Sequence, residues 1–317
     1  MVTELIEIIP EELAGCRLDQ ALAKLCPDYS RSVLKQWIVS GGVLVDDQQK
    51  KPKDKMHGGE VLKIQVQEQA EKGRAEAEDI PLNIHYQDDH LIIINKPAGL
   101  VMHPGAGNWT GTLMNALLHH FPELKTLSRA GIVHRLDQDT TGLLVVARTQ
   151  QAFYQLTKAL EKREISREYE AVIRGGMIAG GSVDEPIGRH PIDRKKMAVR
   201  IGGRVATTHY RLIQRFAHYT HIHLKLETGR THQIRVHMAH LRHPVVGDPV
   251  YSGRMNIPAK MPVELLDFLR SFKRQALHAA RLSLSHPDTG EWMSWSADVP
   301  EDFSQLLTLL ARHDKAE

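Results

Sequence analysis

The stretch IVHRLDQDTTGLLVV, residues 132–146, places a polar insert between two apolar segments. The insert contains two carboxylates, Asp137 and Asp139, and it ends in a threonine pair followed by a glycine. Burying an ionised carboxylate is costly unless a cation or several hydrogen bonds compensate its charge. We therefore expect one of the two acids to be a turn residue and the other to be held in place for a reaction.

The two acids of this stretch differ in their expected surroundings. Asp139 opens a turn, in which its carboxylate can accept hydrogen bonds from backbone amides. Asp137 follows the strand-like segment IVHRL, so it needs a cation from elsewhere in the chain. The segment LETGRTHQIRVHM, residues 226–238, offers Arg230 and Arg235. One guanidinium facing Asp137 would keep that carboxyl ionised, while the alternative, phosphate binding by these arginines, can hold for the other one.

The composition is that of a soluble globular protein, with 317 residues, 42% hydrophobic and 25% charged. No apolar run is long enough to cross a membrane, and the acidic N-terminus does not resemble a signal peptide. Two cysteines, Cys16 and Cys26, make neither a disulfide framework nor a paired metal motif. We expect a cytoplasmic protein that does not interact with membranes.

The net charge of +3 conceals an uneven distribution. Residues 189–242 contain twelve Lys and Arg side chains but only two acids, Asp193 and Glu227, which gives that segment a charge of +10. Such a basic block is typical of a protein that binds a phosphate-rich partner, although a solvated face would look the same in sequence.

The N-terminal part reads as a small α/β module over residues 17–66, preceded by an arm over residues 1–16. Leu18, Ala21, Leu22 and Leu25 predict one helix that ends at Pro27, and Ser30 is a plausible N-cap for a second helix. Two strands follow, VLV at 43–45 and EVLKIQV at 60–66. Residues 67–79 are highly charged and lack β-branched and aromatic side chains, which predicts a linker.

The remaining residues, 80–317, predict an α+β domain with a mixed, largely antiparallel sheet. Strand patterns predominate, and helical patterns occur between them without a regular alternation. The predicted strands include 91–95, 167–173, 206–213, 220–228 and a late pair near 276–300, and the predicted helices include 112–121, 152–164 and 262–272. The segment THQIRVHM is compatible with either a strand or a helix.

The nineteen histidines invite a metal interpretation, which the spacing does not favour. His232, His237, His240 and His243 lie close together, but there is no HExxH motif and no cysteine partner. The glycine-rich segment HPGAGNWTG lacks the lysine of a phosphate-binding loop, and no G-x-S-x-G element is present. We expect neither a metal nor an organic cofactor.

Six motifs occur in an order that resembles the RluA/RluD-type pseudouridine synthases. They are INKPAGLVMHP, GIVHRLDQDTTGLLVVA, REYEA, LETGRTHQIRVHMAH, HPVVGDPVY and ALHA. The N-terminal helix pair and its strands are similar to the RNA-binding module of ribosomal protein S4. The resemblance extends from about residue 17 to residue 300.

The resemblance implies roles for five residues. Asp137 would be the catalytic aspartate, Arg235 its pairing cation and Ile234 an apolar wall of the site. Tyr169 would stack on the target base, and Arg135 would either help to hold the duplex open or occupy the vacated place after the nucleotide flips out. The family breaks the N-glycosidic bond of uridine and rejoins the base through carbon without a cofactor; whether the carboxylate attacks the nucleotide or stabilises its cleavage is left open.

The resemblance also implies a partner. Within the family the motifs are most similar to enzymes of large-subunit (23S) ribosomal RNA that act on the helix 69 stem-loop, on free RNA or on assembly intermediates. We expect a monomer in which exposed cations grip phosphates, namely Arg31, Lys35, Lys51, Lys53, Lys55, Arg230 and His232. Gln138 replaces a lysine that is common after HRLD, and residues 252–266 are the least family-like segment.

Two other classes of function compete with this reading. The first is a ribosome-associated RNA-binding protein without catalysis, which the joint presence of Asp137, Tyr169 and Arg235 disfavours. The second is a metal-dependent RNA hydrolase that uses the histidines, which a strong chelator would inactivate. Other ribosomal uridines or a tRNA uridine compete with helix 69 as the substrate.

Overall fold

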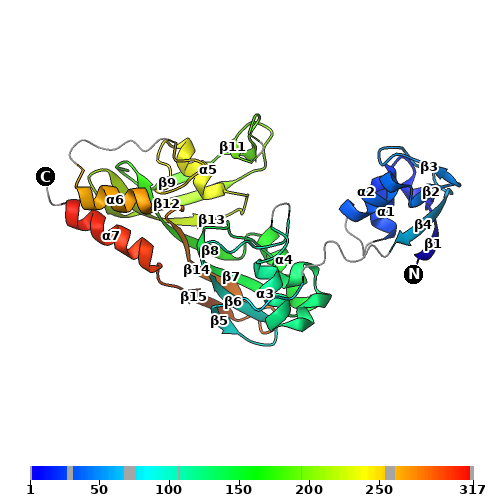
Figure 1. Ribbon diagram of the computed structural model, residues 1–317, viewed down its shortest axis with the longest axis horizontal. Helices are drawn as coiled ribbons and strands as arrows, with labels where there is room; N and C mark the ends of the chain where they lie inside the picture. Colours follow the sequence, from blue (N-terminus) through cyan, green and yellow to red (C-terminus); the bar gives the residue numbers. More distant parts are fainter. Residues whose placement is uncertain are drawn as a thin grey trace. The chain divides into compact units, whose positions relative to one another are not determined.

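The computed structural model describes residues 2–26, 31–67, 76–105, 108–193, 195–253 and 261–314; the side chains of residues 2–4, 31–33, 66 and 67 are not described. It divides into an N-terminal unit, Met1–Arg74, and a C-terminal unit, Ala75–Glu317. Figure 1 shows the elements of both units in chain order. Among the described residues, no helix is long and apolar enough to cross a membrane.

The N-terminal unit packs two helices against a four-stranded antiparallel sheet of order β1-β4-β2-β3. Its elements are β1 (Val2–Ile8), η1 (Glu11–Leu13), α1 (Leu18–Leu25), α2 (Arg31–Ser40), β2 (Val43–Val45), β3 (Gln48–Gln49) and β4 (Val61–Gln67). Leu18, Leu22, Leu34 and Ile38 project from the helices onto Ile64 and its neighbours in one apolar core. The helices and strands expected within residues 17–66 are thus present.

The N-terminal arm is the main departure in this unit. We expected residues 1–16 to precede the folded module, but Val2–Ile8 pairs along its whole length with β4. This edge strand extends the sheet, and Ile9 just beyond it is fully buried in the core of the unit. The expected helix stop at Pro27, the N-cap at Ser30 and most of the linker lie outside the described residues.

The C-terminal unit is built on a nine-stranded mixed sheet of order β5-β6-β7-β14-β8-β13-β12-β9, with β15 also paired to β14. The strands are β5 (Ile84–Gln87), β6 (Leu91–Lys96), β7 (Thr141–Ala147), β8 (Ser166–Arg174), β9 (Gly181–Asp184), β12 (Thr207–Arg215), β13 (Tyr219–Leu226), β14 (Leu277–Ser285) and β15 (Trp292–Ser296). Among these described strands, only β7 and β14 pair in parallel; the other neighbours are antiparallel. The fold is therefore α+β, as expected.

Helices cover both faces of this sheet. They are α3 (Leu113–His120), α4 (Gln150–Glu161), α5 (Gln233–His240), α6 (Val263–Ser271) and α7 (Glu301–Asp314), with short turns η2 (Pro122–Thr126) and η3 (Ser128–Gly131). Alternate residues of β6 face opposite ways, so Ile92 packs in the cluster of α3 and Ile93 in that of α4. A separate hairpin joins β10 (Ile187–Arg189) to β11 (Met197–Val199). Figure 1 shows α6 and α7 side by side.

One local expectation was wrong, and one ambiguous segment took a definite form. Residues 132–136 form no strand; Ile132 makes a single bridge to Val146, and the chain then leaves the sheet. The cause is local, because Nε2 of His134 accepts the N–H of Val145 and so occupies that edge of β7. The segment THQIRVHM is helical from Gln233 onward and forms α5.

Candidate active site

Asp137 lies in a loop that is fixed at both ends. Before it, Arg129, Ala130 and Gly131 all have positive φ, and a Cβ on Gly131 would lie 2.0 Å from the carbonyl oxygen of Ala147. After it, the N–H of Thr140 donates to the carbonyl of Asp137 at 3.1 Å. That turn is closed by a backbone hydrogen bond, and among the described residues no amide donates to the carboxylate of Asp139, contrary to our expectation. The loop holds the Asp137 side chain where it is 15% exposed.

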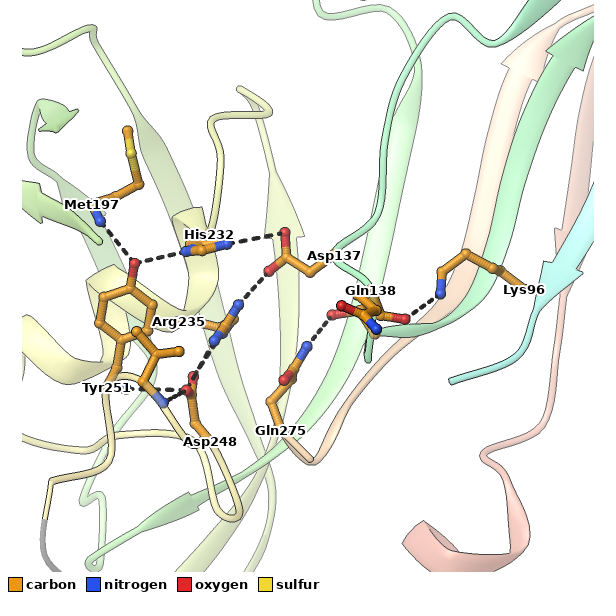
Figure 2. A network of polar contacts seen from close by, with 11 residues as sticks. Lys96, Asp137, Gln138, Met197, His232, Arg235, Asp248, Tyr251 and Gln275 are labelled. Carbon is orange, nitrogen blue, oxygen red and sulfur yellow. Dashed lines mark hydrogen bonds and ion pairs between the residues drawn. The ribbon is translucent and has the colours of Figure 1, made fainter. Parts of the chain in front are cut away.

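The cation that faces Asp137 is Arg235 of α5, ninety-eight residues further along the chain. Its Nη1 donates to Oδ2 of Asp137 at 2.9 Å, and its side chain is only 5% exposed. The same guanidinium donates through Nε and Nη2 to both carboxylate oxygens of Asp248, at 2.7 and 2.9 Å. Figure 2 shows this fork between the two acids. Arg235 is thereby oriented by one carboxylate and presented to the other.

Asp248 is a buried acid that orients Arg235. Its side chain is 0% exposed, and Oδ1 also accepts the backbone N–H groups of Val250 and Tyr251 at 2.8 and 3.1 Å. Burial opposes the charge on Arg235, but the hydrogen bond to Asp248 and the charge of Asp137 outweigh it and raise the pKa of Arg235. Sequence reasoning did not assign a role to Asp248, although it lies in the HPVVGDPVY motif.

His232 connects Asp137 to a further part of the chain. Its Nε2 lies 3.9 Å from Oδ1 of Asp137, and its Nδ1 lies 2.7 Å from the hydroxyl of Tyr251. That hydroxyl accepts the N–H of Met197 in the β10–β11 hairpin at 2.9 Å, so it can donate its own proton to Nδ1 (Figure 2). Burial lowers the pKa of His232, which favours a neutral ring with its proton on Nε2, toward Asp137. The residue we expected on the RNA surface thus lies beside the carboxylate.

The other residues that the sequence singled out are less tightly bonded. Tyr169 is buried on β8, and burial raises the pKa of its hydroxyl, with a smaller contribution from the charge of Asp137. Ile234 is also buried, on α5 next to Arg235. Arg135 is exposed, two residues before Asp137. These residues add a buried aromatic ring and an exposed arginine to the pair of Asp137 and Arg235.

Lys96 is a buried neighbour of the Asp137 loop that the sequence did not single out. It ends β6 and is 0% exposed, and its Nζ donates to the carbonyls of Pro97, Leu100 and Gln138 at 2.7, 3.0 and 2.6 Å. Burial lowers its pKa to about 8, against the opposing charges of Asp139 and Asp137. The bond to Gln138 fixes the peptide that follows Asp137 (Figure 2). A lysine at the end of an apolar strand was the available signal.

The remaining predicted RNA-binding residues are divided between the two units. Lys35, Lys51, Lys53 and Lys55 are exposed in the N-terminal unit, whereas the side chain of Arg31 is not described. Arg230 is half-buried in the C-terminal unit, and its Nε donates to the carbonyl of Val205 at 3.0 Å.

Metal binding finds no support in the part of the chain that the structure describes, where no group of three or more His, Cys, Asp or Glu could hold an ion. Several of the nineteen histidines are engaged by other groups instead. His221 and His223, for example, contact Glu170 and Glu168 at 2.8 and 3.0 Å across neighbouring strands.

Comparison with known proteins defines the class. The family described as RNA pseudouridylate synthase matches residues 90–240, and the S4 domain matches residues 16–62. The chain belongs to the RNA pseudouridine synthase family and has the activity of that family.

Individual relatives are similar over almost their full length. Ribosomal large subunit pseudouridine synthase D of Escherichia coli K12 is 54% identical over 97% of this chain and 94% of that protein. The protein of the same name from Pseudomonas aeruginosa is 52% identical, over 97% and 96% respectively. Among solved structures, human RNA pseudouridylate synthase domain containing 4 superposes with a TM-score of 0.57 at 27% identity, covering 72% of this chain and 93% of that one.

Proposed function

We propose that this protein converts specific uridines of large-subunit ribosomal RNA to pseudouridine, and that Asp137 is the carboxylate that acts on the nucleotide. The relatives named for the large ribosomal subunit support the substrate class. The observation that supports the residue is its pairing with Arg235, a cation whose position is set by Asp248. We further propose the helix 69 stem-loop as the target.

The reaction is an isomerisation that needs no external reactant. The N1–C1′ bond of uridine breaks, the base turns, and a C5–C1′ bond forms; C5 then loses its proton and N1 ends with one. A carboxylate kept ionised can serve this chemistry as a nucleophile or by stabilising positive charge at the sugar. Because Arg235 holds only one oxygen of Asp137 at 2.9 Å, Oδ1 is left toward His232 and the substrate.

The bond that breaks is shielded inside an RNA helix, so the nucleotide must leave the stack. In this proposal the base stacks on Tyr169, with Ile234 as an apolar wall, and Arg135 occupies the vacated position. Unstacking is cheaper in a loop than in a duplex, which favours a stem-loop substrate.

The S4 domain gives the N-terminal unit its proposed part. In this proposal Lys35, Lys51, Lys53 and Lys55 contact phosphates of structured RNA, which their exposure and the match to the S4 domain support. These contacts fix the position of the enzyme on the RNA without contributing to the chemical step.

The test compares matched variants of the two neighbouring acids. Pseudouridines in total ribosomal RNA are mapped by carbodiimide treatment and primer extension in a strain without the protein, complemented with wild type, Asp137→Asn or Asp139→Asn. We expect stops in helix 69 to return with wild type and with Asp139→Asn but not with Asp137→Asn. Restoration by Asp137→Asn would refute the assigned carboxylate, and returning stops confined to other sites would refute helix 69.

A further inference from the structure

A second buried guanidinium in the C-terminal unit has no counter-charge among the described residues. Arg167 lies on β8 and is 7% exposed. Its Nε has no hydrogen-bond partner, and within the described ranges no carboxylate forms an ion pair with its side chain. A buried cation without a counter-charge is unfavourable for folding, so its presence calls for another explanation.

Arg167 faces the same way as Tyr169. Successive side chains of a strand alternate between the two faces of a sheet, and residues two apart lie about 6.6 Å apart along one face. Both residues are buried, whereas Glu168 between them is half-buried on the opposite face. The residues paired with Arg167 on the flanking strands are Leu226 and Leu282, which offer no side-chain acceptor.

The acids near this part of the sheet are already engaged. Glu168 contacts His223 at 3.0 Å and Glu170 contacts His221 at 2.8 Å on the opposite face. Glu227, at the end of β13, is held by Arg163 and by His209, each at 2.7 Å. These three acids are therefore paired with other side chains, and none of them neutralises the charge of Arg167.

Other cations gather around the same place. Burial and the charges of Arg204, Arg163 and Arg167 lower the pKa of Arg230, so these guanidiniums share one positive region. The turn that carries Arg230 passes directly over Arg167, since a Cβ on Gly229 would lie 2.4 Å from its Nη1. Glycine at position 229 is what lets the turn and the guanidinium approach so closely.

We propose that Arg167, together with Arg230, binds a backbone phosphate of the RNA beside the nucleotide whose base lies at Tyr169. This inference rests on the proposed function, because it takes Tyr169 as the place of the target base. A phosphate supplies the counter-charge that the protein withholds, and a planar guanidinium matches its oxygens. Binding the backbone at this point would anchor a flipped nucleotide without reading its base.

The first test uses Arg167→Met, with Arg281→Met as the matched control, because Arg281 is an exposed arginine on the adjacent strand β14. Without RNA, we expect Arg167→Met to unfold at the same urea concentration as wild type or a higher one, since it removes an uncompensated buried charge. Its affinity for the helix 69 stem-loop should fall about ten- to a hundredfold. The slope of the salt dependence should decrease by about one unit, while the control should retain both the affinity and the slope of wild type.

A lower unfolding midpoint for Arg167→Met would overturn the proposal, because Arg167 would then stabilise the fold. Unchanged RNA affinity would overturn it as well. Gly229→Ala keeps every charge but displaces the guanidinium, so it should weaken binding in the same direction; wild-type affinity in this variant would contradict the geometry.

The second test identifies the phosphate. The phosphates flanking the target uridine are replaced in turn by neutral methylphosphonates, and affinities are measured for wild type and Arg167→Met. At one position the methylphosphonate should lower the RNA affinity of wild type but leave that of Arg167→Met unchanged. If the methylphosphonate and the Arg167→Met substitution reduce affinity independently at every flanking position, Arg167 does not bind a phosphate there.

The RNA target and the phosphate site can be refuted separately. Asp137→Asn should bind the stem-loop with wild-type affinity and the same methylphosphonate pattern, but form no product. If the wild-type protein leaves helix 69 unmodified, the proposed target is refuted. The methylphosphonate affinities of wild type and Arg167→Met are then measured on the RNA that mapping identifies. If wild type forms product normally but the effects of the methylphosphonates and of Arg167→Met on affinity are independent, only the phosphate site is refuted.

Discussion

Arg235 and Arg167 are both buried arginines of the C-terminal unit, yet the protein treats their charges in opposite ways. Arg235 contacts two carboxylates and shares its guanidinium between Asp137 and Asp248. Arg167 contacts none among the described residues. The difference teaches that a buried charge can be compensated within the fold or left for a polyanionic substrate, and that only the second choice sacrifices stability for binding.

The largest expected effect comes from replacing each arginine with methionine, which tests whether the two charges contribute differently to stability. Arg235→Met leaves Asp248 buried and unpaired, so we expect a loss of about 3–5 kcal/mol in the free energy of unfolding and no measurable pseudouridine formation. Arg167→Met should show no such loss. Urea unfolding of the two variants measures the contrast, and equal destabilisation would remove the distinction between them.

Lys96 extends the comparison to a cation held by carbonyls. Lys96→Met leaves the acceptors of Pro97, Leu100 and Gln138 without their donor, so we expect a loss of about 1–3 kcal/mol at pH 7. Product formation should slow because the peptide after Asp137 is released. Urea unfolding and single-turnover assays measure the two effects.

The pH dependence distinguishes burial of the Lys96 charge from loss of packing. The pKa of Lys96 is lowered to about 8 in the fold, so between pH 8 and 10.5 the unfolded chain binds the extra proton. The stability of wild type relative to Lys96→Met should therefore rise with pH in that window, by at most about 1.4 kcal/mol per unit. A constant difference would show that folding does not lower the pKa of Lys96.

His134 differs from Lys96, because it is a half-buried base that is neutral in the fold near pH 7. Burial lowers its pKa to about 3, while its Nε2 accepts the N–H of Val145. As pH falls from 6.5 toward 3, the unfolded chain takes up a proton that the folded chain does not, and this residue should contribute a loss of stability. His134→Gln keeps an acceptor for Val145 without titrating.

We expect His134→Gln to match wild type near pH 7 and to lose less stability in acid, by up to about 1.4 kcal/mol per pH unit. Unfolding midpoints at pH 7, 6, 5 and 4 give the profile. Parallel profiles for the two proteins would show that this imidazole is not the acid-sensitive group.

The exposed cations of the N-terminal unit should have the smallest effect on stability. Replacing Lys51, Lys53 and Lys55 with glutamine should leave the unfolding midpoint within experimental error, because exposed charges contribute little to folding. RNA affinity should fall, and its salt dependence should weaken by about one unit for each phosphate that the protein no longer neutralises. Titrations at several salt concentrations decide this, and an unchanged slope would remove these lysines from the RNA interface.

Local patterns along the chain were sufficient for most of the fold. Apolar spacing located α1 and the strands β2 and β4 of the N-terminal unit but not β1, and alternation located β8, β12 and β13. Helix α7 was not foreseen, and IVHRL was assigned to a strand. The apolar residues of IVHRL are compatible with a strand. However, Nε2 of His134 accepts the N–H of Val145 in β7, which a neighbouring strand would otherwise bind.

The sequence by itself determined the family, the α+β class and the candidate residues Asp137, Tyr169 and Arg235, because those depend on motif identity and on periodicity. The tertiary structure decided which charges meet. It set Asp248 behind Arg235, moved His232 beside the carboxylate, buried Lys96 among carbonyls and left Arg167 uncompensated. These outcomes depend on contacts between residues far apart in the chain, where distance and burial rather than residue type determine the interaction energy.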